Sequence, residues 1–401
     1  MINSVCGVLS TGKICADIAQ RMEENGHECR IAYGRGSVPE KYKKYAFRIG
    51  TDFDVNLHAI YTRLTDKHGF SSRKYTEKFI RWAEEYNPDL LWIHNIHGYY
   101  INIELLFNWI KSKPDMKVKW TLHDCWAFTG HCTYFMVSKC EKWKIGCEKC
   151  TQNSDYPASI TNRNCSWNYA KKEELFTGIQ NMTLVAPSNW LANLVKESFL
   201  KEYPIEVSHN TINTEIFKPT ESDFRTKYGL ENKKIVLGVA STWSKRKGLN
   251  DFIKLSQMLD DNYVVVLVGV SKKQSKTIQK QTKSNFVKQS EMFGDEAKNR
   301  DIVLRTESGI AIKPNVVALY GAVTGQEYKI TNTRSSVVCI PRTNSAKELA
   351  EIYTAADVFV NPTYEDNYPT VNLEAQACGT KVITYDTGGC IETLLNWEKA
   401  K

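Results

Sequence analysis

Short apolar runs alternate with amphipathic stretches along most of the 401-residue chain. Stretches 76–85, 248–259 and 346–355 repeat apolar residues every three to four positions, the period of a helix packed on one face. Strands that alternate with such helices form parallel sheets. The pattern therefore predicts an α/β protein with strands at 90–94, 118–122, 184–186, 235–240, 263–268, 337–340, 358–361 and 382–385.

The rhythm pauses between residues 209 and 219, where Asn, Thr and Pro follow a strand-like segment, and it restarts at Lys234. A chain of this length exceeds one ordinary core and suits two α/β domains. We place these domains at 1–211 and 212–401 and expect their sheets to face each other across a cleft. Ligands of such sheets bind beyond the carboxyl ends of the strands, so we expect functional residues directly after each strand.

Residues 271–336 break the rhythm. The segment starts as a Lys/Gln/Ser-rich run and continues with β-prone stretches at 302–305, 316–320 and 328–331, which we interpret as an insertion into the second domain. Residues 272–334 contain twelve basic and six acidic side chains and so carry +6 of the net charge of +8. Such a patch attracts nucleic acid, an anionic bilayer or anionic substrates, or is a solvated face without a partner.

Composition narrows the class of protein. A hydrophobic content of 42% with 24% charged residues is typical of globular proteins and excludes disordered or fibrous architectures. Residues 1–19 lack a basic stretch followed by a sustained apolar run, and no apolar run reaches membrane-spanning length, so we expect a cytoplasmic protein. In that setting the twelve cysteines indicate free thiols or a metal site rather than disulfides.

Two acidic residues stand out in residues 361–379, which follow a predicted strand and enter a helix that starts near Pro369. The start of a helix directs free N–H groups and a positive dipole end beyond the strand, which suits a diphosphate. Glu374 in this helix can accept hydrogen bonds from ribose hydroxyls, and Asp366 in the preceding loop can hold the hydroxyls of a sugar. The alternative is that both acids are solvated or only cap the helix.

This segment resembles the donor-site motif of glycosyltransferase family 4, in which two acids separated by seven positions precede a small-residue helix that ends in Gly. Asp366 and Glu374 have that spacing, although the first acid of the family is usually Glu and here Glu365 stands beside Asp366. The resemblance extends through the strand and Gly-Gly turn at 382–389 and covers 186–191, 210–219 and 340–344. It implies donor-binding roles for Arg342, Asn367, Tyr368 and Thr370.

A basic turn, 238–248, follows another predicted strand. Departure of a nucleoside diphosphate builds negative charge on a phosphate oxygen, so a fixed cation there stabilises the transition state. By resemblance Lys247 is that cation and Arg246 binds the donor beside it, while Ser241 stands where the family often has Arg. The alternative is a basic helix start on the surface.

Residues 121–132 also follow a strand and are similar to a subgroup of the family that acts in bacterial surface-polysaccharide assembly, of the colanic acid, capsule and exopolysaccharide type. His123 matches the strand-end histidine of the family that approaches donor sugar and acceptor, and Asp124 stands beside it. The alternative is a structural histidine.

Four cysteines, Cys132, Cys140, Cys147 and Cys150, lie within nineteen residues. Four thiolates at such spacing can form a tetrahedral zinc site that pins a long loop. His131 is a competing ligand, and unliganded thiols are the alternative.

Residues 7–13 nearly spell a phosphate-binding P-loop, but Ile14 stands where that motif needs Ser or Thr to bind magnesium. A nucleoside-triphosphate hydrolase is therefore disfavoured. The family resemblance makes this turn a glycine-bearing loop and brings Gly12 near the donor or the acceptor.

Together these features predict a GT-B fold, two facing Rossmann-like doubly wound domains with an insertion in the second. We expect metal-independent, retaining transfer of a hexosyl group from a nucleotide-sugar to a saccharide or lipid-linked acceptor in surface-polysaccharide biosynthesis. Same-face attack by the acceptor, with the leaving phosphate as base, is implied by the family. We expect no cofactor except a structural zinc, no nucleic-acid partner, and peripheral contact with the inner membrane.

The alternative is a catalytically inactive GT-B descendant that binds sugar nucleotides or polysaccharide. The chain stops at Lys401, soon after the Gly-Gly turn, whereas the family normally continues, so we expect a shortened C-terminus. The segment 271–336 also follows the carboxyl end of a strand, where it can serve as a lid or obstruct the site.

Overall fold

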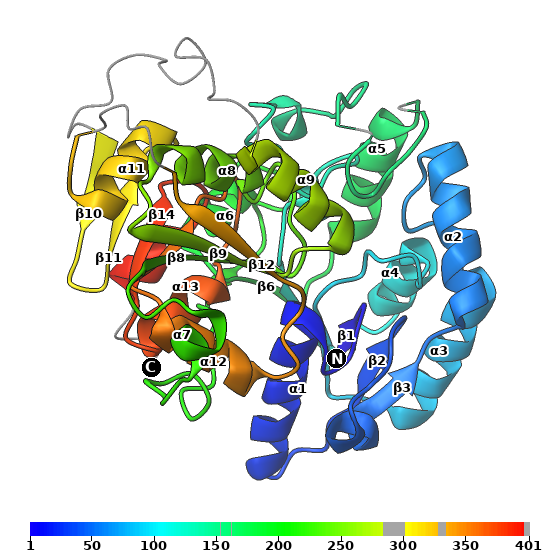
Figure 1. The fold of residues 1–401 in the computed structure, drawn as a ribbon. Helices are drawn as coiled ribbons and strands as arrows, with labels where there is room; N and C mark the ends of the chain where they lie inside the picture. The colour runs from blue at the N-terminus through cyan, green and yellow to red at the C-terminus, as the bar shows by residue number, and fades with distance from the viewer. Residues whose placement is uncertain (153, 162, 284–300, 328–333, 397–401) are drawn as a thin grey trace. The chain divides into compact units, whose positions relative to one another are not determined.

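The computed structural model describes residues 1–152, 154–161, 163–283, 301–327 and 334–396. The chain divides into two compact units, Met1–Ser208 (unit 1) and His209–Lys401 (unit 2). Each unit is a mainly parallel sheet with helices on its faces, as Figure 1 shows. The sequence-based boundary, 211/212, falls just beyond the observed division.

Unit 1 contains a seven-stranded sheet in the order β3-β2-β1-β4-β5-β6-β7, and all of its strand pairs are parallel. The order reverses between β1 and β4, which makes their carboxyl ends a topological switch point, where ligands of such sheets bind. The strands are β1 (Ile2–Asn3), β2 (Ile31–Tyr33), β3 (Ala46–Arg48), β4 (Leu90–Ile93), β5 (Lys117–Thr121), β6 (Met182–Ala186) and β7 (Ile205–Val207).

Helices return the chain between these strands, and the core of the unit is rich in aromatic rings. Trp120 of β5 packs against Phe107 and Phe176, with ring centroids 5.4 and 5.0 Å apart, and all three are buried. The helices are α1 (Leu9–Glu24), η1 (Glu40–Tyr45), α2 (Asp52–Thr65), α3 (Arg73–Tyr86), α4 (Ile103–Lys111), η2 (Trp126–Phe128), η3 (Lys142–Lys144), α5 (Cys165–Phe176) and α6 (Asn189–Lys196).

Unit 2 has a second seven-stranded sheet, in the order β10-β11-β14-β13-β8-β9-β12. Its pairs are parallel except β10 with β11, and the order reverses between β8 and β13, a second switch point. The strands are β8 (Lys234–Val239), β9 (Tyr263–Val268), β10 (Ile302–Arg305), β11 (Gly309–Ile312), β12 (Ser336–Ile340), β13 (Val358–Asn361) and β14 (Lys381–Tyr385).

Two helices of unit 2 lie where the apolar period predicted them: α8 falls within the predicted 248–259, and α12 has the predicted bounds. The buried faces of β8 and β9 are almost wholly Val, Ile and Leu, as expected for strands covered on both sides. The helices are α7 (Phe224–Tyr228), α8 (Leu249–Met258), α9 (Lys272–Lys283), α11 (Val316–Thr324), α12 (Ala346–Ala355), α13 (Thr370–Ala377) and α14 (Glu392–Leu395).

The segment 271–336 differs from its prediction. Its described part is joined to the sheet of unit 2, because β11 is buried and pairs in parallel with β14, with Gly309 opposite Val382. Residues 316–320 are helical rather than extended, since the Asn315 side chain accepts from the Val317 N–H at 2.8 Å and caps α11. The predicted strand at 328–331 lies outside the described residues.

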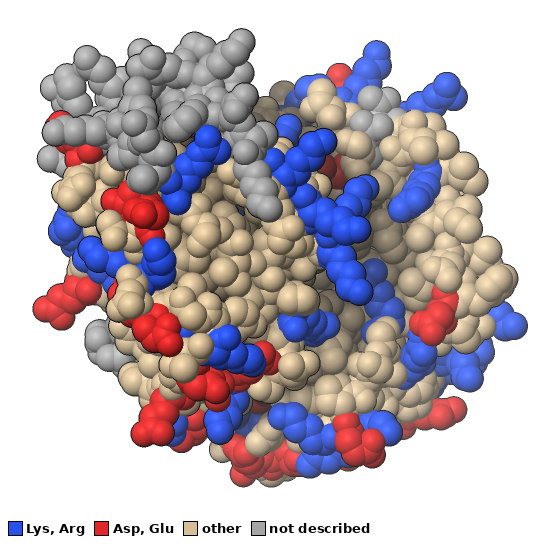
Figure 2. All heavy atoms as spheres, in the orientation of Figure 1, with Lys and Arg blue, Asp and Glu red and all other residues tan. Residues whose placement is uncertain are grey.

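Basic charge gathers on this segment as predicted. Figure 2 shows Lys side chains clustered over α9, where four described lysines are exposed: Lys272, Lys273, Lys276 and Lys280. None of the described helices combines the length and apolar character needed to cross a bilayer.

Candidate active site

The switch point of unit 2 brings together the two loops that the sequence singled out. Gly248, in the loop after β8, has a positive φ of 73°, and a Cβ there would lie 2.2 Å from the carbonyl oxygen of Pro362, after β13. Gly388 of the Gly-Gly turn has a φ of 58°, and a Cβ there would lie 2.0 Å from the Asp366 carbonyl oxygen. Glycine is required at both positions, because the backbones approach too closely for a side chain.

Lys247 and Asp366 form an ion pair at this junction, from Lys Nζ to Asp Oδ2. Their side chains are 22% and 15% exposed, so the pair is neither solvated nor fully enclosed. Burial of the Asp366 carboxyl works to raise its pKa, but the charges of Lys247 and Arg246 and the N–H of Asn367 outweigh burial, and the pKa lies below its usual value. The predicted cation and the predicted sugar-binding acid therefore neutralise each other.

Arg246 ties the same two loops together. Its guanidinium donates to the Glu365 carbonyl oxygen, and its own carbonyl accepts from the Tyr364 N–H at 2.8 Å and the Thr363 hydroxyl at 3.2 Å. These bonds give Arg246 an architectural role beside the donor-binding role predicted from resemblance.

Glu374 lies in α13, whose N-cap is Pro369, the predicted start. The Tyr353 hydroxyl of α12 donates to Glu374 Oε2 at 3.1 Å and so orients the carboxylate. Amides anchor the helix: Asn361, the last residue of β13, donates to Asn372 Oδ1 at 2.8 Å, and Asn372 donates to the Thr393 hydroxyl at 2.8 Å. The carboxylate that was predicted to hold ribose is therefore attached to a rigid element.

The remaining residues predicted to bind the donor differ in how deeply they are buried. Asn367 and Tyr368 are buried, and the Tyr368 ring stacks on His209 with centroids 4.7 Å apart. Thr370 is the first residue of α13 and half-buried, whereas Arg342 is exposed in the loop after β12.

The switch point of unit 1 carries two imidazoles, His94 and His123, close to the carboxylate of Asp124. His94 directly follows β4, and its Nδ1 lies 3.1 Å from Nε2 of His123, which follows β5. Burial lowers the pKa of His123 to about 4, with Asp124 opposing and His97 adding to the effect, and burial lowers the pKa of His94 well below its usual value. Both rings are therefore neutral near pH 7.

A second set of polar contacts at these strand ends centres on Asp124. His97 Nε2 lies 2.8 Å from Asp124 Oδ2, His97 Nδ1 lies 3.0 Å from the Tyr156 hydroxyl, and the Trp126 N–H donates to Asp124 Oδ1 at 2.9 Å. Burial opposes ionisation of Asp124, but His97 and the Trp126 N–H outweigh burial, so its pKa is lowered. His94, His97, His123, Asp124 and Trp126 line one small cavity.

The cysteine cluster contains one member that the sequence did not indicate. Thiol contacts join Cys150 to Cys132 and to Cys165, and Cys165 to Cys147; these contacts lower the pKa of Cys150 and raise that of Cys165. Cys165 is the first residue of α5, distant in sequence from the predicted four, whereas the thiol contacts do not include Cys140, which lines the same cavity of about 290 Å³.

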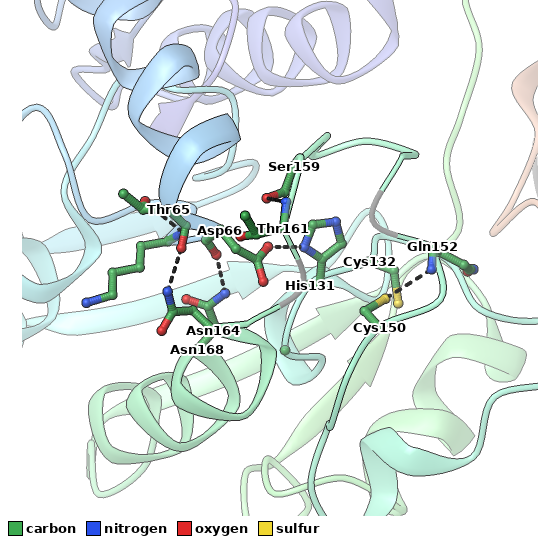
Figure 3. A network of polar contacts seen from close by, with 12 residues as sticks. Thr65, Asp66, His131, Cys132, Cys150, Gln152, Ser159, Thr161, Asn164 and Asn168 are labelled. Carbon is green, nitrogen blue, oxygen red and sulfur yellow. Dashed lines mark hydrogen bonds and ion pairs between the residues drawn. The ribbon is translucent and has the colours of Figure 1, made fainter.

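One nitrogen of His131, the competing ligand, is already engaged: its Nδ1 lies 2.6 Å from Asp66 Oδ1, and both side chains are buried (Figure 3). In the part of the chain that the structure describes, no three His, Cys, Asp or Glu side chains are placed to hold a metal ion. Zinc therefore stays a prediction from cysteine spacing.

The glycine turn near the N-terminus differs from the predicted loop. Gly12 lies inside α1, buried, where a Cβ would come within 2.9 Å of Val5 Cγ2. Lys13 is exposed on the same helix. Because residues 9–13 are helical, Gly12 serves close packing in this structure.

The sequence analysis missed His94, His97 and Cys165 as members of these groups. The rule that site residues follow strand ends, already used for His123, could have identified His94 and His97. No spacing pattern could have indicated Cys165, because only the packing of α5 brings it to the other thiols.

Both halves of the chain match family models. The model for Glycosyltransferase Family 4 matches residues 11–216, and the model for Glycosyl transferases group 1 matches residues 327–400. The chain is 27% identical over 153 residues to the putative colanic acid biosynthesis glycosyl transferase WcaC of Escherichia coli K12, a match covering 36% of this chain and 37% of that protein.

A second relative is the N,N'-diacetylbacillosaminyl-diphospho-undecaprenol alpha-1,3-N-acetylgalactosaminyltransferase of Campylobacter jejuni, 36% identical over 59 residues, which cover 14% of this chain and 16% of that protein. The matched segments thus span well under half of these curated relatives.

Solved structures agree on the fold. Sucrose-phosphate synthase from Thermosynechococcus elongatus aligns with a TM-score of 0.59 at 13% identity, covering 98% of this chain and 82% of that one. Anabaena Alr3699/HepE in complex with UDP and glucose aligns with a TM-score of 0.54 at 14% identity, covering 98% and 81%. At such identity the likeness establishes architecture and leaves chemistry to the site.

Proposed function

The chain belongs to glycosyltransferase family 4 and has its GT-B architecture, and from this premise we propose that it is a retaining glycosyltransferase. It moves a hexosyl group from a nucleotide-sugar donor to a saccharide or lipid-linked saccharide in bacterial surface-polysaccharide biosynthesis. The names of the colanic acid and undecaprenol-linked relatives support this acceptor class.

One observation carries the proposal: the ion pair of Lys247 with Asp366, held by glycine-dependent loop contacts at the switch point of unit 2. A diphosphate that arrives there offers Lys247 a stronger anionic partner, and the start of α13 offers N–H groups to the same anion. Charge on the leaving diphosphate then grows against a cation already in position, which lowers the barrier without a metal ion.

The remaining roles follow from geometry. Glu374, oriented by Tyr353, accepts hydrogen bonds from ribose hydroxyls, and Asp366, released from Lys247, holds sugar hydroxyls together with Asn367. His123 donates a neutral hydrogen bond at the reacting face. The acceptor hydroxyl attacks from the face that the diphosphate leaves, and a phosphate oxygen takes its proton.

The test is a donor panel of UDP-glucose, UDP-galactose, UDP-N-acetylgalactosamine and GDP-mannose, followed by thermal shift and slow donor hydrolysis. The variants are Glu374→Ala and, as a control on the exposed surface of the same unit, Glu231→Ala. We expect one donor to stabilise the protein and to be hydrolysed by wild type and Glu231→Ala but not by Glu374→Ala. Binding without turnover, even with lipid-linked acceptors added, supports the inactive binding protein, and no binding overturns the donor site.

We also propose that the protein docks on an anionic bilayer, through the outer face of α2. That face is apolar: Phe53, Leu57, Ile60 and Leu64 recur at helical spacing and are 71, 47, 54 and 59% exposed. The inward face holds His58 and Thr62, both fully buried, so folding of the chain does not account for the apolar residues.

Charge near α2 favours a bilayer over a protein partner. Arg63 lies on the exposed face, and the preceding and following segments carry an excess of Lys and Arg. Four side chains on one helix fall short of the ~800 Å² per partner of a stable protein interface, whereas an interfacial helix needs only such a face with cations near it.

Sedimentation with phosphatidylglycerol vesicles at low salt tests the docking. We expect wild type to pellet and the double variant Leu57→Asp with Ile60→Asp to stay in solution, while Asn56→Asp, which adds charge without removing apolar surface, loses less. Equal binding by wild type and double variant contradicts docking through α2. Membrane contact would then have to be tested on the exposed lysines of α9.

A further inference from the structure

The two imidazoles at the switch point of unit 1 form a stacked pair between neighbouring strands. β4 and β5 are parallel, with Ile93 opposite Trp120, and this register brings the residues that follow them together. The ring centroids of His94 and His123 lie 5.4 Å apart with 19° between the planes, and Nδ1 of His94 lies 3.1 Å from Nε2 of His123.

The surroundings of His94 fix its ring. His94 also stacks against Trp92, with centroids 5.6 Å apart and 21° between planes, and the Trp92 indole donates to the Thr121 hydroxyl at 2.8 Å. Its backbone N–H donates to the Ile2 carbonyl at 2.9 Å, and its carbonyl accepts from the Trp120 indole at 3.2 Å. His94 is 2% exposed.

Only one hydrogen lies between Nδ1 of His94 and Nε2 of His123, because both rings are neutral near pH 7. The groups that bear on this charge state are Asp124 and His97 around His123, and the terminal amine of Met1 toward His94. One ring must therefore donate through its nitrogen and the other accept.

The remaining nitrogen of His94 decides which ring donates. Its Nε2 is buried and has no partner among the described residues. A buried N–H without an acceptor is rarer in proteins than an unpaired acceptor, so the proton of His94 belongs on Nδ1. His94 then donates to Nε2 of His123, and His123 carries its own proton on Nδ1.

We infer that His94 is a positioning residue for the proposed transfer reaction, which holds the His123 ring in one orientation and in the Nδ1–H tautomer, so that His123 acts as a neutral donor. This inference rests on the proposed function. An outer partner that fixes tautomer and orientation is the usual requirement of an imidazole at a reacting centre.

A matched pair of variants tests it. In His94→Asn the amide nitrogen stands in for Nδ1 and preserves the bond to His123, whereas in His94→Gln the amide lies nearer the Nε2 position. Hydrolysis of the panel donor that wild type turns over is measured from pH 5 to 8, with donor binding and thermal melting as fold controls. We expect His94→Asn to stay near wild type and His94→Gln to lose roughly tenfold or more in kcat with KM for the donor unchanged.

Ring-nitrogen NMR on histidine-labelled protein provides a readout independent of turnover. We expect the Nδ1–H tautomer of His123 in wild type and His94→Asn, and a mixture of tautomers in His94→Gln. A wild-type His123 protonated on Nε2, or equal kcat losses in the two variants, overturns the inference. A wild type that binds no donor and shows no hydrolysis refutes the proposed function instead, and the tautomer still decides the role of His94.

Discussion

The switch points of the two units carry different kinds of polar side chains. In unit 2 the loops after β8 and β13 carry charged groups, and Lys247 and Asp366 form an ion pair where we propose that an anionic ligand binds. In unit 1 the loops after β4 and β5 carry His94 and His123, which burial keeps neutral, beside the carboxylate of Asp124. A site that receives a diphosphate needs a cation held in position, whereas a site that orients hydroxyls needs fixed neutral donors and acceptors.

Histidine content follows the same division. Seven of the eight histidines precede residue 209, and His58, His68, His94 and His123 all have lowered pKa values caused first by burial. The two sheets each have a switch point, but different side chains occupy it. A change of pH should therefore act mainly on unit 1, and charge substitutions mainly on unit 2.

The largest expected effect is on the cation of unit 2. Lys247→Ala removes the charge that faces the leaving diphosphate, and we expect kcat to fall by about a hundredfold or more. Lys245→Ala, in the same turn but exposed, should leave kcat near wild type. Steady-state donor hydrolysis measures both, and equal effects at the two lysines contradict the role of Lys247.

Acid should destabilise unit 1 before unit 2. Burial lowers the pKa of His58 to about 3, while an unfolded histidine titrates near 6.5. Because the unfolded chain binds this proton first, stability is complete above pH 6.5 and declines as pH falls toward 3, by about 2 kcal/mol at pH 5 for His58 alone.

Peptide-level hydrogen exchange at pH 7 and pH 5, corrected for intrinsic rates, assigns this loss to a unit. We expect protection to decrease in residues 1–208 while residues 209–396 change little. A loss of protection confined to unit 2, or uniform across the chain, goes against the distinction between the two units.

A smaller effect is expected from the partner of Glu374. Tyr353→Phe removes the hydroxyl that donates to the carboxylate at 3.1 Å but keeps the buried ring. Loss of one such bond corresponds to roughly 1 kcal/mol, or about fivefold in donor affinity. Isothermal titration with the panel donor measures the change, and unaltered affinity indicates that Glu374 needs no help from Tyr353.

The smallest effect concerns the thiols of unit 1, where zinc is predicted from spacing and the contacts replace Cys140 by Cys165. Metal analysis of purified protein tests the spacing prediction of one zinc per chain: if the thiol contacts define the site, occupancy falls in Cys165→Ser and is kept in Cys140→Ser, with little change in donor binding by unit 2. A metal analysis well below one zinc per chain in wild type ends the zinc prediction.

Much of the fold was readable from periodicity, because buried parallel strands and their helices leave strong apolar patterns. The strands at 263–268 and 358–361 and the helix at 346–355 have the predicted bounds. The short strands β1, β2, β3 and β7 are too brief to show a period and were not among the strands listed from the pattern. At 316–320 the β-branched residues indicated a strand, but the Asn315 cap and the surrounding packing made a helix.

The sequence alone indicated which residues of unit 2 we propose for the chemistry, because Lys247 and Asp366 follow predicted strands and Glu374 lies in the helix after the second of them. Tertiary structure decided how they are used: the Lys247–Asp366 pair, the loop bonds of Arg246 and the Tyr353 contact of Glu374. It also decided the His94–His123 pair and the place of Cys165. Strand-end position can be read along one chain, whereas the partner of a side chain depends on which strands become neighbours, and that is set only when the whole sheet folds.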